Sequence, residues 1–386
     1  MELTAIDVYL VDLPLTEPFV ASHGTTTSRT LSLLRVTTDA GIGWGECSAL
    51  PAATYTAESA VGSYRALADR IGPALIGLQV PTEDVGPPGF EALQELPMAR
   101  SCVEMALLDA RLTAAGTSLA AWLSNRVDTS RPGTSEPPLE VIPTMIPAGV
   151  SVGLASIAET VETCAALAAE GYRRLKVKIQ PGHDVRLVEQ LIARLPDIEL
   201  HVDANGAYPP GSDPLLDLVS AGAAVIEQPF AASEAAAAAE LIARLEAEGR
   251  SVTVVADEAV TRHDDAVRLL SARAMTGLSI KPGRVGGILP ALALHDLCRS
   301  AGIAATAGGM LETGLGRHAL VALAALPGFT LTGDLSPAGR WLAADPWPDL
   351  SLTDGHIMVP TQPGVCGDPD PELLAAHTVE HTSLGG

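Results

Sequence analysis

The sequence predicts an α/β protein in which a (β/α)8-type barrel, TIM-like but modified, carries an α+β capping domain. Strand-like and helix-like segments alternate from about residue 140, and this alternation favours a parallel sheet. Charged side chains recur at the ends of successive strand-like segments, at intervals close to one β/α unit. The first part of the chain has longer strand-like runs, which indicates a separate domain. With 386 residues, 47% of them hydrophobic, the chain is long enough for a barrel with an addition.

Residues 1–126 form the predicted capping domain. Two strand-like runs, "LTAIDVYLV" and "RTLSLLRVTTDAGIGWGEC", are joined through "SHGTTTS", and helical segments follow around residues 57–76 and 97–124. The joining segment, residues 21–28, contains Gly24 and five Ser or Thr residues, so we expect a mobile lid there.

Three further segments complete the predicted domain plan. Residues 127–139 belong to a run rich in Pro, Ser and Thr, and we expect them to be a linker. The barrel domain is expected at residues 140–349. Residues 350–386 are rich in Pro and Gly, include the strand-like "HIMVP", and are expected to pack back on the capping domain.

The predicted barrel contains eight strand-like and seven helix-like segments in alternation. The strand-like segments are, in order, "EVIPTMI", "YRRLKVKI", "IELHVDAN", "AAVIEQPF", "SVTVVADEA", "GLSIKPG", "IAATAGG" and "FTLTGD". The helix-like segments between them begin with the Ala-rich "ASIAETVETCAALAAEG" and end with "GRHALVALAAL". An open doubly wound sheet is the structural alternative, but no G-x-G-x-x-G opens any of these helices.

Polar side chains gather at the carboxyl ends of these strands, the end that forms the active face of barrel enzymes. In strand order they are Lys176 and Lys178, Asp203 and Asn205, Glu227, Asp257 and Glu258, and Lys281. The steps from Lys178 through three of the acids to Lys281 are 25, 24, 30 and 24 residues, which repeats the β/α unit. Because residues i and i+2 of a strand share a face, Lys176 and Lys178 lie side by side. A solvated edge strand would also explain two such lysines, but their place in this series favours the barrel interior.

The residue types at these strand ends indicate the chemistry. Three carboxylates, those of Asp203, Glu227 and Asp257, would repel one another unless a cation lay between them, and oxygen ligands without Cys or His select Mg²⁺ or Mn²⁺. Asp203 or Asp257 alone could be a helix N-cap, but Pro229 separates Glu227 from any helix start. A desolvated lysine beside a second cation has a lowered pKa and can act as a base. Bases and a divalent cation together can remove a proton α to a carboxylate and stabilise the enediolate.

Two other classes of function remain open at this stage. The segment "GVSVG" (149–153) matches the G-x-S-x-G pattern of serine hydrolases, with Ser151 as nucleophile and His295, His318 or His356 as base. That reading leaves the lysines at the strand ends without a role. A non-catalytic protein could also use a metal and lysines to hold a dicarboxylate. A hydrolase would tolerate EDTA, and a binding protein would not exchange the α-protons of its ligand.

Composition excludes several partners. The formal net charge of −22 argues against nucleic acid or an anionic membrane as a partner. The five cysteines are dispersed, which fits free thiols in a reducing compartment. The N-terminal segment has no basic region typical of a signal peptide. We therefore expect a soluble, cytoplasmic protein that acts on a small molecule.

Several segments together resemble one known family. They are "GWGECSALPAATYTAES" (43–59), "KVK", "VDAN", "IEQP", "ADE", "IKPGRVGG" and "GGMLETGLGRHALVALAALPGFTLTGD" (308–334). On these segments the chain resembles the muconate-lactonizing subgroup of the enolase superfamily. Within it, "KPGRVGG" and "GGMLETGLGR" are most similar to o-succinylbenzoate synthases and to the branch that includes N-succinylamino acid racemases.

The resemblance implies roles for the residues already singled out. Asp203, Glu227 and Asp257 would bind Mg²⁺, with Mn²⁺ able to substitute, while Lys178 and Lys281 would be the catalytic pair assisted by Lys176. The substrate-binding residues would be Asn205, Ser151, Tyr55, Gly309 and Met310, with Glu258 next to the last metal ligand. We expect a small-molecule carboxylate as substrate and a homo-oligomer.

The resemblance also implies a reaction. The expected activity is an o-succinylbenzoate synthase of menaquinone biosynthesis, which dehydrates 2-succinyl-6-hydroxy-2,4-cyclohexadiene-1-carboxylate. The alternative is racemization of N-succinylamino acids, alone or beside the first activity. Muconate cycloisomerase fits residues 308–334 less well, and dipeptide epimerase is disfavoured because no Asp-x-Asp follows the seventh or eighth strand.

Overall fold

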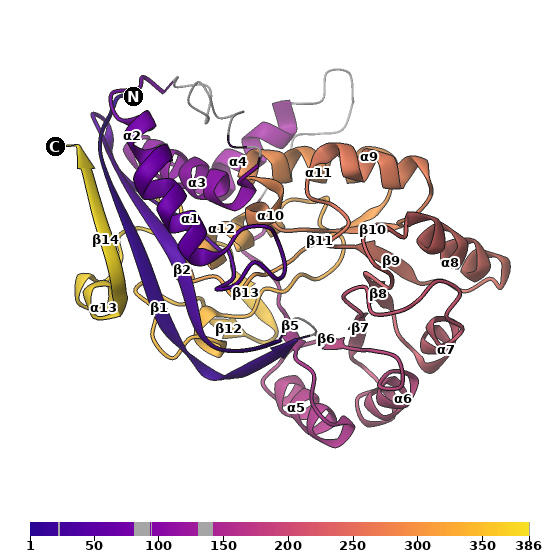
Figure 1. Ribbon diagram of the computed structural model, residues 1–386. Coiled ribbons are helices and arrows are strands. Elements are labelled where there is room, and N and C mark those ends of the chain that lie inside the picture. Colours follow the sequence, from indigo (N-terminus) through magenta and orange to yellow (C-terminus); the bar gives the residue numbers. More distant parts are fainter. Residues whose placement is uncertain (22–23, 81–92, 94, 130–141, 386) are drawn as a thin grey trace.

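A computed structural model describes residues 1–21, 24–80, 93, 95–129 and 142–385. Figure 1 shows an antiparallel sheet with its helices on one side of the molecule and a curled parallel sheet, with helices outside it, on the other. The predicted barrel with an α+β capping domain is confirmed. In the described part of the chain no helix is both long and apolar enough to cross a membrane.

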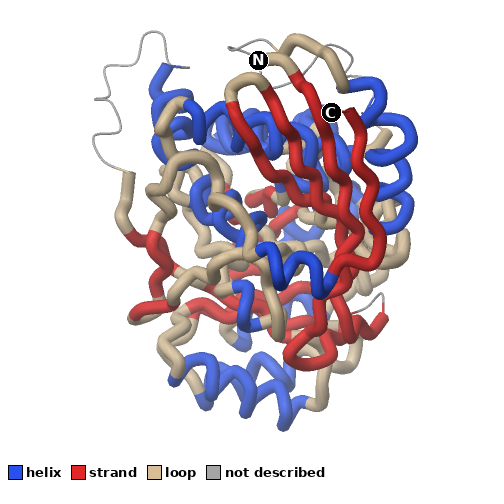
Figure 2. The backbone as a smooth tube through the Cα atoms, turned by 90° about the vertical axis from the view of Figure 1, so that its left-hand side faces the viewer, coloured by secondary structure: helices blue, strands red, loops and turns tan. Residues whose placement is uncertain are grey.

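The capping sheet has four antiparallel strands, in the order β14-β1-β2-β3. They are β1 (Leu3–Ala21), β2 (Gly24–Thr38), β3 (Gly41–Cys47) and the C-terminal β14 (Thr378–Gly385). The long run predicted as the second strand is therefore two strands, because a tight turn reverses the chain between Thr38 and Gly41. β14 pairs with β1, so the end of the chain lies on this sheet (Figure 2).

Among the residues that the structure describes, five helical segments follow the first three strands. They are α1 (Ala60–Arg65), a π-helical turn (Ala66–Ile71), α2 (Gly72–Leu75), α3 (Pro97–Ala114) and α4 (Leu119–Thr129). Helix α3 lies directly on β3, where a Cβ on Gly43 or Gly45 would collide with backbone atoms of α3. The two glycines of "GWGEC" thus let the helix approach the strand closely.

Two predicted connecting segments have a different structure. Residues 24–28 belong to β2, and Ala21 pairs with Gly24, so most of the expected lid continues the hairpin. Residues 22 and 23 of that lid lie outside the described residues. The expected linker 127–139 begins inside α4, and residues 130–139 also lie outside the described residues.

The barrel sheet contains seven parallel strands among the described residues, not the eight predicted. They are β5 (Gly149–Val152), β6 (Arg174–Lys178), β7 (Glu199–Asp203), β8 (Val225–Glu227), β9 (Thr253–Ala256), β10 (Gly277–Ile280) and β11 (Ala304–Ala307). The register pairs Lys178 with Asp203 and Asp203 with Glu227, so neighbouring strands end together.

Both ends of the predicted strand series need correction. "EVIPTMI" does not begin the barrel: it contributes β4 (Met145–Pro147), which pairs with β13 (His356–Met358), itself paired with β12 (Leu352–Thr353). "FTLTGD" is not a regular strand. Its backbone donates hydrogen bonds from Leu331 and Asp334 to β11, and Leu335 donates one to Gly149 of β5. An irregular segment therefore joins the two edge strands of the sheet.

Helices cover the outside of the barrel sheet (Figure 1). They are α5 (Ile157–Ala169), α6 (Val185–Arg194), α7 (Pro214–Ala221), α8 (Ala235–Ala247), α9 (His263–Ser271), α11 (Ile288–Ala301) and α12 (Gly314–Ala324). Three short helical segments, α10 (Pro282–Val285), the 3₁₀ turn Ala338–Arg340 and α13 (Pro371–His377), were not predicted. Leu175 and Val177 are fully buried in the main hydrophobic core, which leaves the alternate residues of β6 to point into the barrel.

Candidate active site

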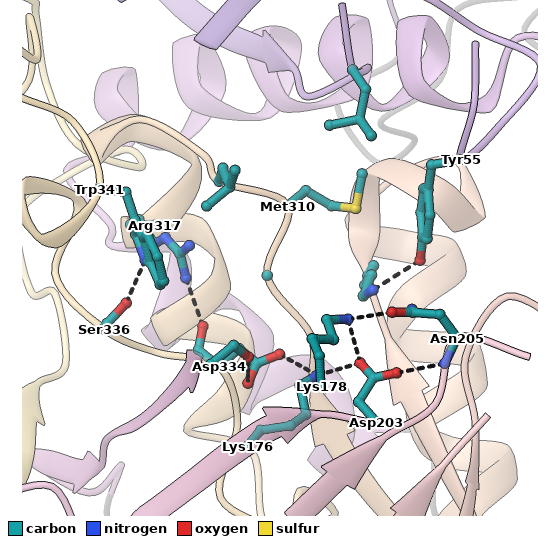
Figure 3. Close-up of a pocket in the computed structure, with 15 residues that line it drawn as sticks. Tyr55, Lys176, Lys178, Asp203, Asn205, Met310, Arg317, Asp334, Ser336 and Trp341 are labelled. Atoms are coloured by element: carbon teal, nitrogen blue, oxygen red, sulfur yellow. Dashed lines mark hydrogen bonds and ion pairs between the residues drawn. The ribbon is translucent and has the colours of Figure 1, made fainter. Parts of the chain in front are cut away.

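A pocket lies at the carboxyl ends of the barrel strands, beneath the capping domain (Figure 3). It encloses about 770 Å³ of empty space, its open mouth included. Nine of the predicted site residues line it: Tyr55, Ser151, Lys176, Lys178, Asp203, Asn205, Lys281, Gly309 and Met310. The other three, Glu227, Asp257 and Glu258, are bonded to the lysines or to Asn205 of that wall. The structure thus brings all twelve predicted residues together.

Lys176 is surrounded by carboxylates. Its Nζ lies 3.0 Å from Glu227 Oε2, 2.7 Å from Asp334 Oδ2 and 3.5 Å from Asp203 Oδ2. Burial alone would lower the pKa of Lys176, but Asp334, Glu227 and Asp203 outweigh it and hold the pKa well above its usual value. Lys176 is therefore a fixed cation beside Lys178.

Lys178 has a different set of partners. Its Nζ donates to Asp203 Oδ2 and to the Asn205 side-chain oxygen, both at 2.7 Å. The amide nitrogen of Asn205 donates in turn to Glu258 Oε1 at 2.7 Å. Glu258 thus orients the amide of Asn205, and this explains why an acid directly follows Asp257.

Lys281 approaches the same pocket from β10. Its Nζ lies 2.8 Å from Asp257 Oδ2 and donates to the hydroxyl of Tyr55, also at 2.8 Å. The Tyr55 hydroxyl donates to Asp257 Oδ2 at 3.1 Å. Tyr55 is the link by which the capping domain reaches the polar wall of the barrel.

Sequence reasoning missed Arg284, which forms an ion pair with Asp257 Oδ1. Arg284 is buried and also donates to the backbone carbonyls of Val260 and Ser279, at 3.0 and 2.8 Å. Burial raises the pKa of Asp257, but the positive charges of Arg284 and Lys281 lower it by more than this. The pKa is therefore below its usual value, and the carboxyl stays ionised. The available signal was the spacing: Arg284 follows Lys281 by three residues, about one turn of the short helix α10.

Asp334 is the second residue that the prediction overlooked. It accepts hydrogen bonds from Ser151 Oγ at 2.9 Å and from Arg174 Nη1 at 2.5 Å, and it contacts Lys176 as described. Burial raises the pKa of Asp334, but Lys176 and Arg174 hold it well below its usual value. The signal for it was present, because Asp334 ends the last predicted strand as the other acids end theirs.

Arg317, Ser336 and Trp341 form the wall of the pocket on the side away from Tyr55 and Asn205 (Figure 3). Trp341 Nε1 donates to Ser336 Oγ at 2.9 Å, and Arg317 Nη1 donates to the Asp334 carbonyl at 2.6 Å. A Cβ on Gly309 would lie 2.9 Å from Arg317 Nη1, so glycine leaves room for the guanidinium. None of these three residues stood out in the sequence.

The carboxylates fit a hard divalent cation by their chemistry. Within the described ranges no three acid, His or Cys side chains converge on one point, since each carboxylate is bonded to a cationic side chain. Asp203, Glu227 and Asp257 nevertheless end adjacent strands and are at most 1% exposed. Burial, and after it the repulsion of Asp203 and Asp257, raises the pKa of Glu227 to about 7 despite the nearby Lys176. Three buried, mutually repelling oxygen donors match Mg²⁺ or Mn²⁺.

The hydrolase alternative finds no triad in this geometry. Ser151 donates to the carboxylate of Asp334, which is already paired with two cations. The histidines that a triad would use have other partners. His295 is bonded to Asp296 and Gly328, His318 to the Gly314 carbonyl and His356 to the Asp354 carbonyl.

Comparison with known proteins covers nearly the whole chain. Residues 5–123 match the family model of the mandelate racemase / muconate lactonizing enzyme N-terminal domain, and residues 159–373 match that of the enolase C-terminal domain-like family. An N-succinylamino acid racemase from Amycolatopsis sp is 38% identical over 100% of both chains. An o-succinylbenzoate synthase from Bacillus subtilis is 32% identical over 98% of each chain.

Solved structures agree with these relatives. A member of the enolase superfamily from Listeria innocua superposes with a TM-score of 0.84 at 28% identity, over 100% of this chain and 99% of that one. An N-succinyl Arg/Lys racemase from Bacillus cereus, at 23% identity and the same TM-score, shares the fold over 100% of both chains. The resemblance inferred from the sequence is confirmed.

Proposed function

Because the chain belongs to the mandelate racemase / muconate lactonizing enzyme family of the enolase superfamily, we propose that it removes the proton α to a carboxylate and stabilises the resulting enediolate. The observation that carries the proposal is the placement of two lysines. Lys178 on β6 and Lys281 after β10, with three strands between them, line one pocket, and each is bonded to a buried carboxylate.

Each side chain has a role in this reaction. Asp203, Glu227 and Asp257 would hold Mg²⁺, whose positive charge offsets the charge that develops on the substrate carboxylate. Lys178 is the base that takes the α-proton. Lys176 stays charged next to it.

We propose dehydration to o-succinylbenzoate as the first activity. One base suffices for it, since Lys178 can remove the proton and then protonate the departing hydroxide from the same face. Lys281 then acts through its charge beside the developing enediolate. The relative named o-succinylbenzoate synthase supports this assignment.

Racemization of N-succinylamino acids is the second candidate activity. It needs a base on each face of the α-carbon, one to remove the proton and one to return it, and Lys178 and Lys281 are both available in the pocket. The 38% identical relative named N-succinylamino acid racemase supports it. A substrate with a free α-ammonium group would need a carboxylate partner in the pocket. Asp334 is a carboxylate that lines the pocket, but it is already bonded to Arg174, Lys176 and Ser151, so such a substrate fits less well.

Two assays on the purified enzyme with Mg²⁺ test the proposal. The first follows dehydration of the cyclohexadiene carboxylate precursor, and the second follows deuterium incorporation at the α-carbon of N-succinylamino acids in D₂O. Racemization without dehydration would leave only the second candidate. If neither substrate reacts while Mg²⁺ still binds, the substrate assignment fails and the proposed proton abstraction has to be tested on other carboxylates.

A variant separates the two lysines. With Lys281→Ala, a racemase should still exchange the α-proton of one enantiomer while it loses racemization, because only one face keeps its base. Unchanged racemization in Lys281→Ala would contradict the two-base assignment.

A further inference from the structure

A row of polar side chains crosses the inside of the barrel from the opposite end of the strands to the pocket. Glu199, the first residue of β7, lies with its Oε1 2.6 Å from His201 Nε2. Arg174 Nε donates to His201 Nδ1 at 3.0 Å, and Arg174 Nη1 donates to Asp334 Oδ1 at 2.5 Å. Asp334 Oδ2 lies 2.7 Å from Lys176 Nζ. The row therefore ends at the cation beside Lys178.

These residues occupy space that barrels normally fill with branched apolar side chains. Arg174 is 2% exposed, His201 1% and Lys176 3%. Arg174, Lys176 and Lys178 alternate along β6, and the register sets Lys176 beside His201 and Lys178 beside Asp203. Burying such groups is costly, and an apolar core of equal volume is often at least as stable. Stability alone therefore does not explain the row.

The donors and acceptors fix the direction of each bond. Arg174 Nε can only donate, so His201 Nδ1 is the acceptor of that bond. The proton of the neutral ring is then on His201 Nε2, which donates a hydrogen bond to Glu199 Oε1. One oxygen of Asp334 then serves Arg174 and Ser151, and the other is left for Lys176. Arg174 and His201 thereby hold the Asp334 carboxylate in one orientation.

Lys176 Nζ contacts two groups of carboxylates. Asp334 lies on one side of its Nζ, and Glu227 and Asp203, two of the three carboxylates assigned to the metal, lie on the other. We propose that Asp334 is a positioning residue, fixed from inside the barrel by Arg174 and His201, that keeps Lys176 from moving fully onto these two carboxylates. The inference rests on the proposed function, since it assigns Glu227 and Asp203 to the metal and Lys178 to the proton.

The test uses Asp334→Asn and a matched pair at His201, a residue that does not line the pocket. Asn at 201 keeps an acceptor for Arg174, and Leu removes it. We expect Asp334→Asn to weaken Mn²⁺ binding, measured by electron paramagnetic resonance without substrate, and to lower kcat, each by about 10- to 100-fold, as loss of outer partners does at metal sites. His201→Leu should also lower Mn²⁺ affinity and kcat, whereas His201→Asn should keep both near the wild-type values. In each variant KM should change less than kcat.

A buried acid elsewhere gives the control. Asp109 in α3 accepts backbone hydrogen bonds from Trp44 and Val365, at 2.8 and 2.7 Å. Asp109→Asn should lower the melting temperature without changing Mn²⁺ affinity or kcat. Wild-type Mn²⁺ affinity and kcat in Asp334→Asn, or equal values in His201→Leu and His201→Asn, would overturn the proposal.

Failure of the proposed function gives a different pattern. If the wild type turns over neither substrate, the Mn²⁺ affinities of the same variants still decide the positioning role. If Asp334→Asn does not fold, the His201 pair decides it alone. Crystal structures add a direct readout. Lys176 Nζ is already bonded to both oxygens of Glu227, at 3.1 and 3.0 Å, so in Asp334→Asn it should move closer to Asp203 Oδ2, which lies 3.5 Å away, and an unmoved Lys176 would contradict the inference.

Discussion

Replacing Arg284 by Met should disable one of the two lysines without touching it. Arg284 and Lys281 hold opposite oxygens of Asp257, a carboxylate with no exposed surface. Met keeps an unbranched apolar chain in place of the Arg284 methylenes and removes the charge and the donors of the guanidinium. Asp257 is then left with Lys281 and Tyr55, and the carbonyls of Val260 and Ser279 lose their side-chain donor.

The cost can be estimated from these contacts. Removing one partner of a buried ion pair costs about 3–5 kcal/mol, and the low end applies because Lys281 remains to neutralise Asp257. In a domain of about 150–250 residues, a loss of about 3 kcal/mol lowers the melting temperature by about 6–12 °C, and the shift is smaller for a longer chain such as this one. Lys281 should also be held more tightly by Asp257, so proton transfer on its face of the substrate should slow.

Two measurements check this. Thermal unfolding gives the stability, and deuterium exchange into each enantiomer of an N-succinylamino acid gives the rate on each face. We expect exchange from the Lys281 face to fall by about tenfold or more, as for loss of a partner that orients a catalytic group, while exchange from the Lys178 face changes little. The control is Arg250→Met, since Arg250 is partly exposed and pairs with Glu248 on the surface, where such pairs contribute about 1 kcal/mol or less. Equal slowing on both faces, or a stability equal to the wild type, would refute the role given to Arg284.

Three further predictions concern the metal, the packing inside the capping domain and pH. EDTA should abolish activity and Mg²⁺ or Mn²⁺ restore it; Glu227→Gln should weaken Mn²⁺ binding, measured by calorimetry, while circular dichroism stays that of a folded protein. Gly45→Ala should destabilise the capping domain, because the new Cβ would collide with the Cys102 carbonyl. Overpacking of a core typically costs about 1–3 kcal/mol, and we expect a loss of stability of this order. A melting temperature within error of the wild type would show that α3 can shift at no cost. Glu104 is buried beside the Leu289 amide, and burial raises its pKa to about 7. Because the raised pKa favours the protonated form in the folded state, its contribution is complete below the unfolded pKa, about 4.3, and is lost as pH rises through about 7. Glu104→Gln should flatten this part of the curve of melting temperature against pH, and an unchanged slope would contradict the assignment.

The parts of the site that the sequence predicted share one property: each follows from local pattern. The alternation in "RLKVK" gave the face of Lys176 and Lys178, and Leu175 and Val177 are indeed buried on the other side. Regular spacing placed Asp203 and the later strand ends on one edge of the sheet. These features depend only on strand geometry and on the repeat of the β/α unit.

The parts that it missed depend on contacts between distant segments. β4 was assigned to the barrel because "EVIPTMI" has a strand pattern, but its pairing partner is β13, more than 200 residues later. Asp334 ends the last predicted strand as the other acids end theirs, but its partner Arg174 lies 160 residues earlier in the chain. Arg284 lies in a short helix that no periodicity reveals, and its partner Asp257 is 27 residues away. Residue type alone could not identify these partners.

Lys176 and Lys178 have similar neighbours in the sequence but different partners in the structure. Lys176 has three carboxylates around it and a side chain only 4% exposed, so its charge is fixed. Lys178 has one carboxylate, Asp203, and the neutral amide of Asn205, and its side chain is 13% exposed in the pocket. Of the pair, Lys178 therefore has fewer carboxylate partners and more exposure to the pocket, which fits the role of base proposed for it, whereas Lys176 is enclosed by carboxylates.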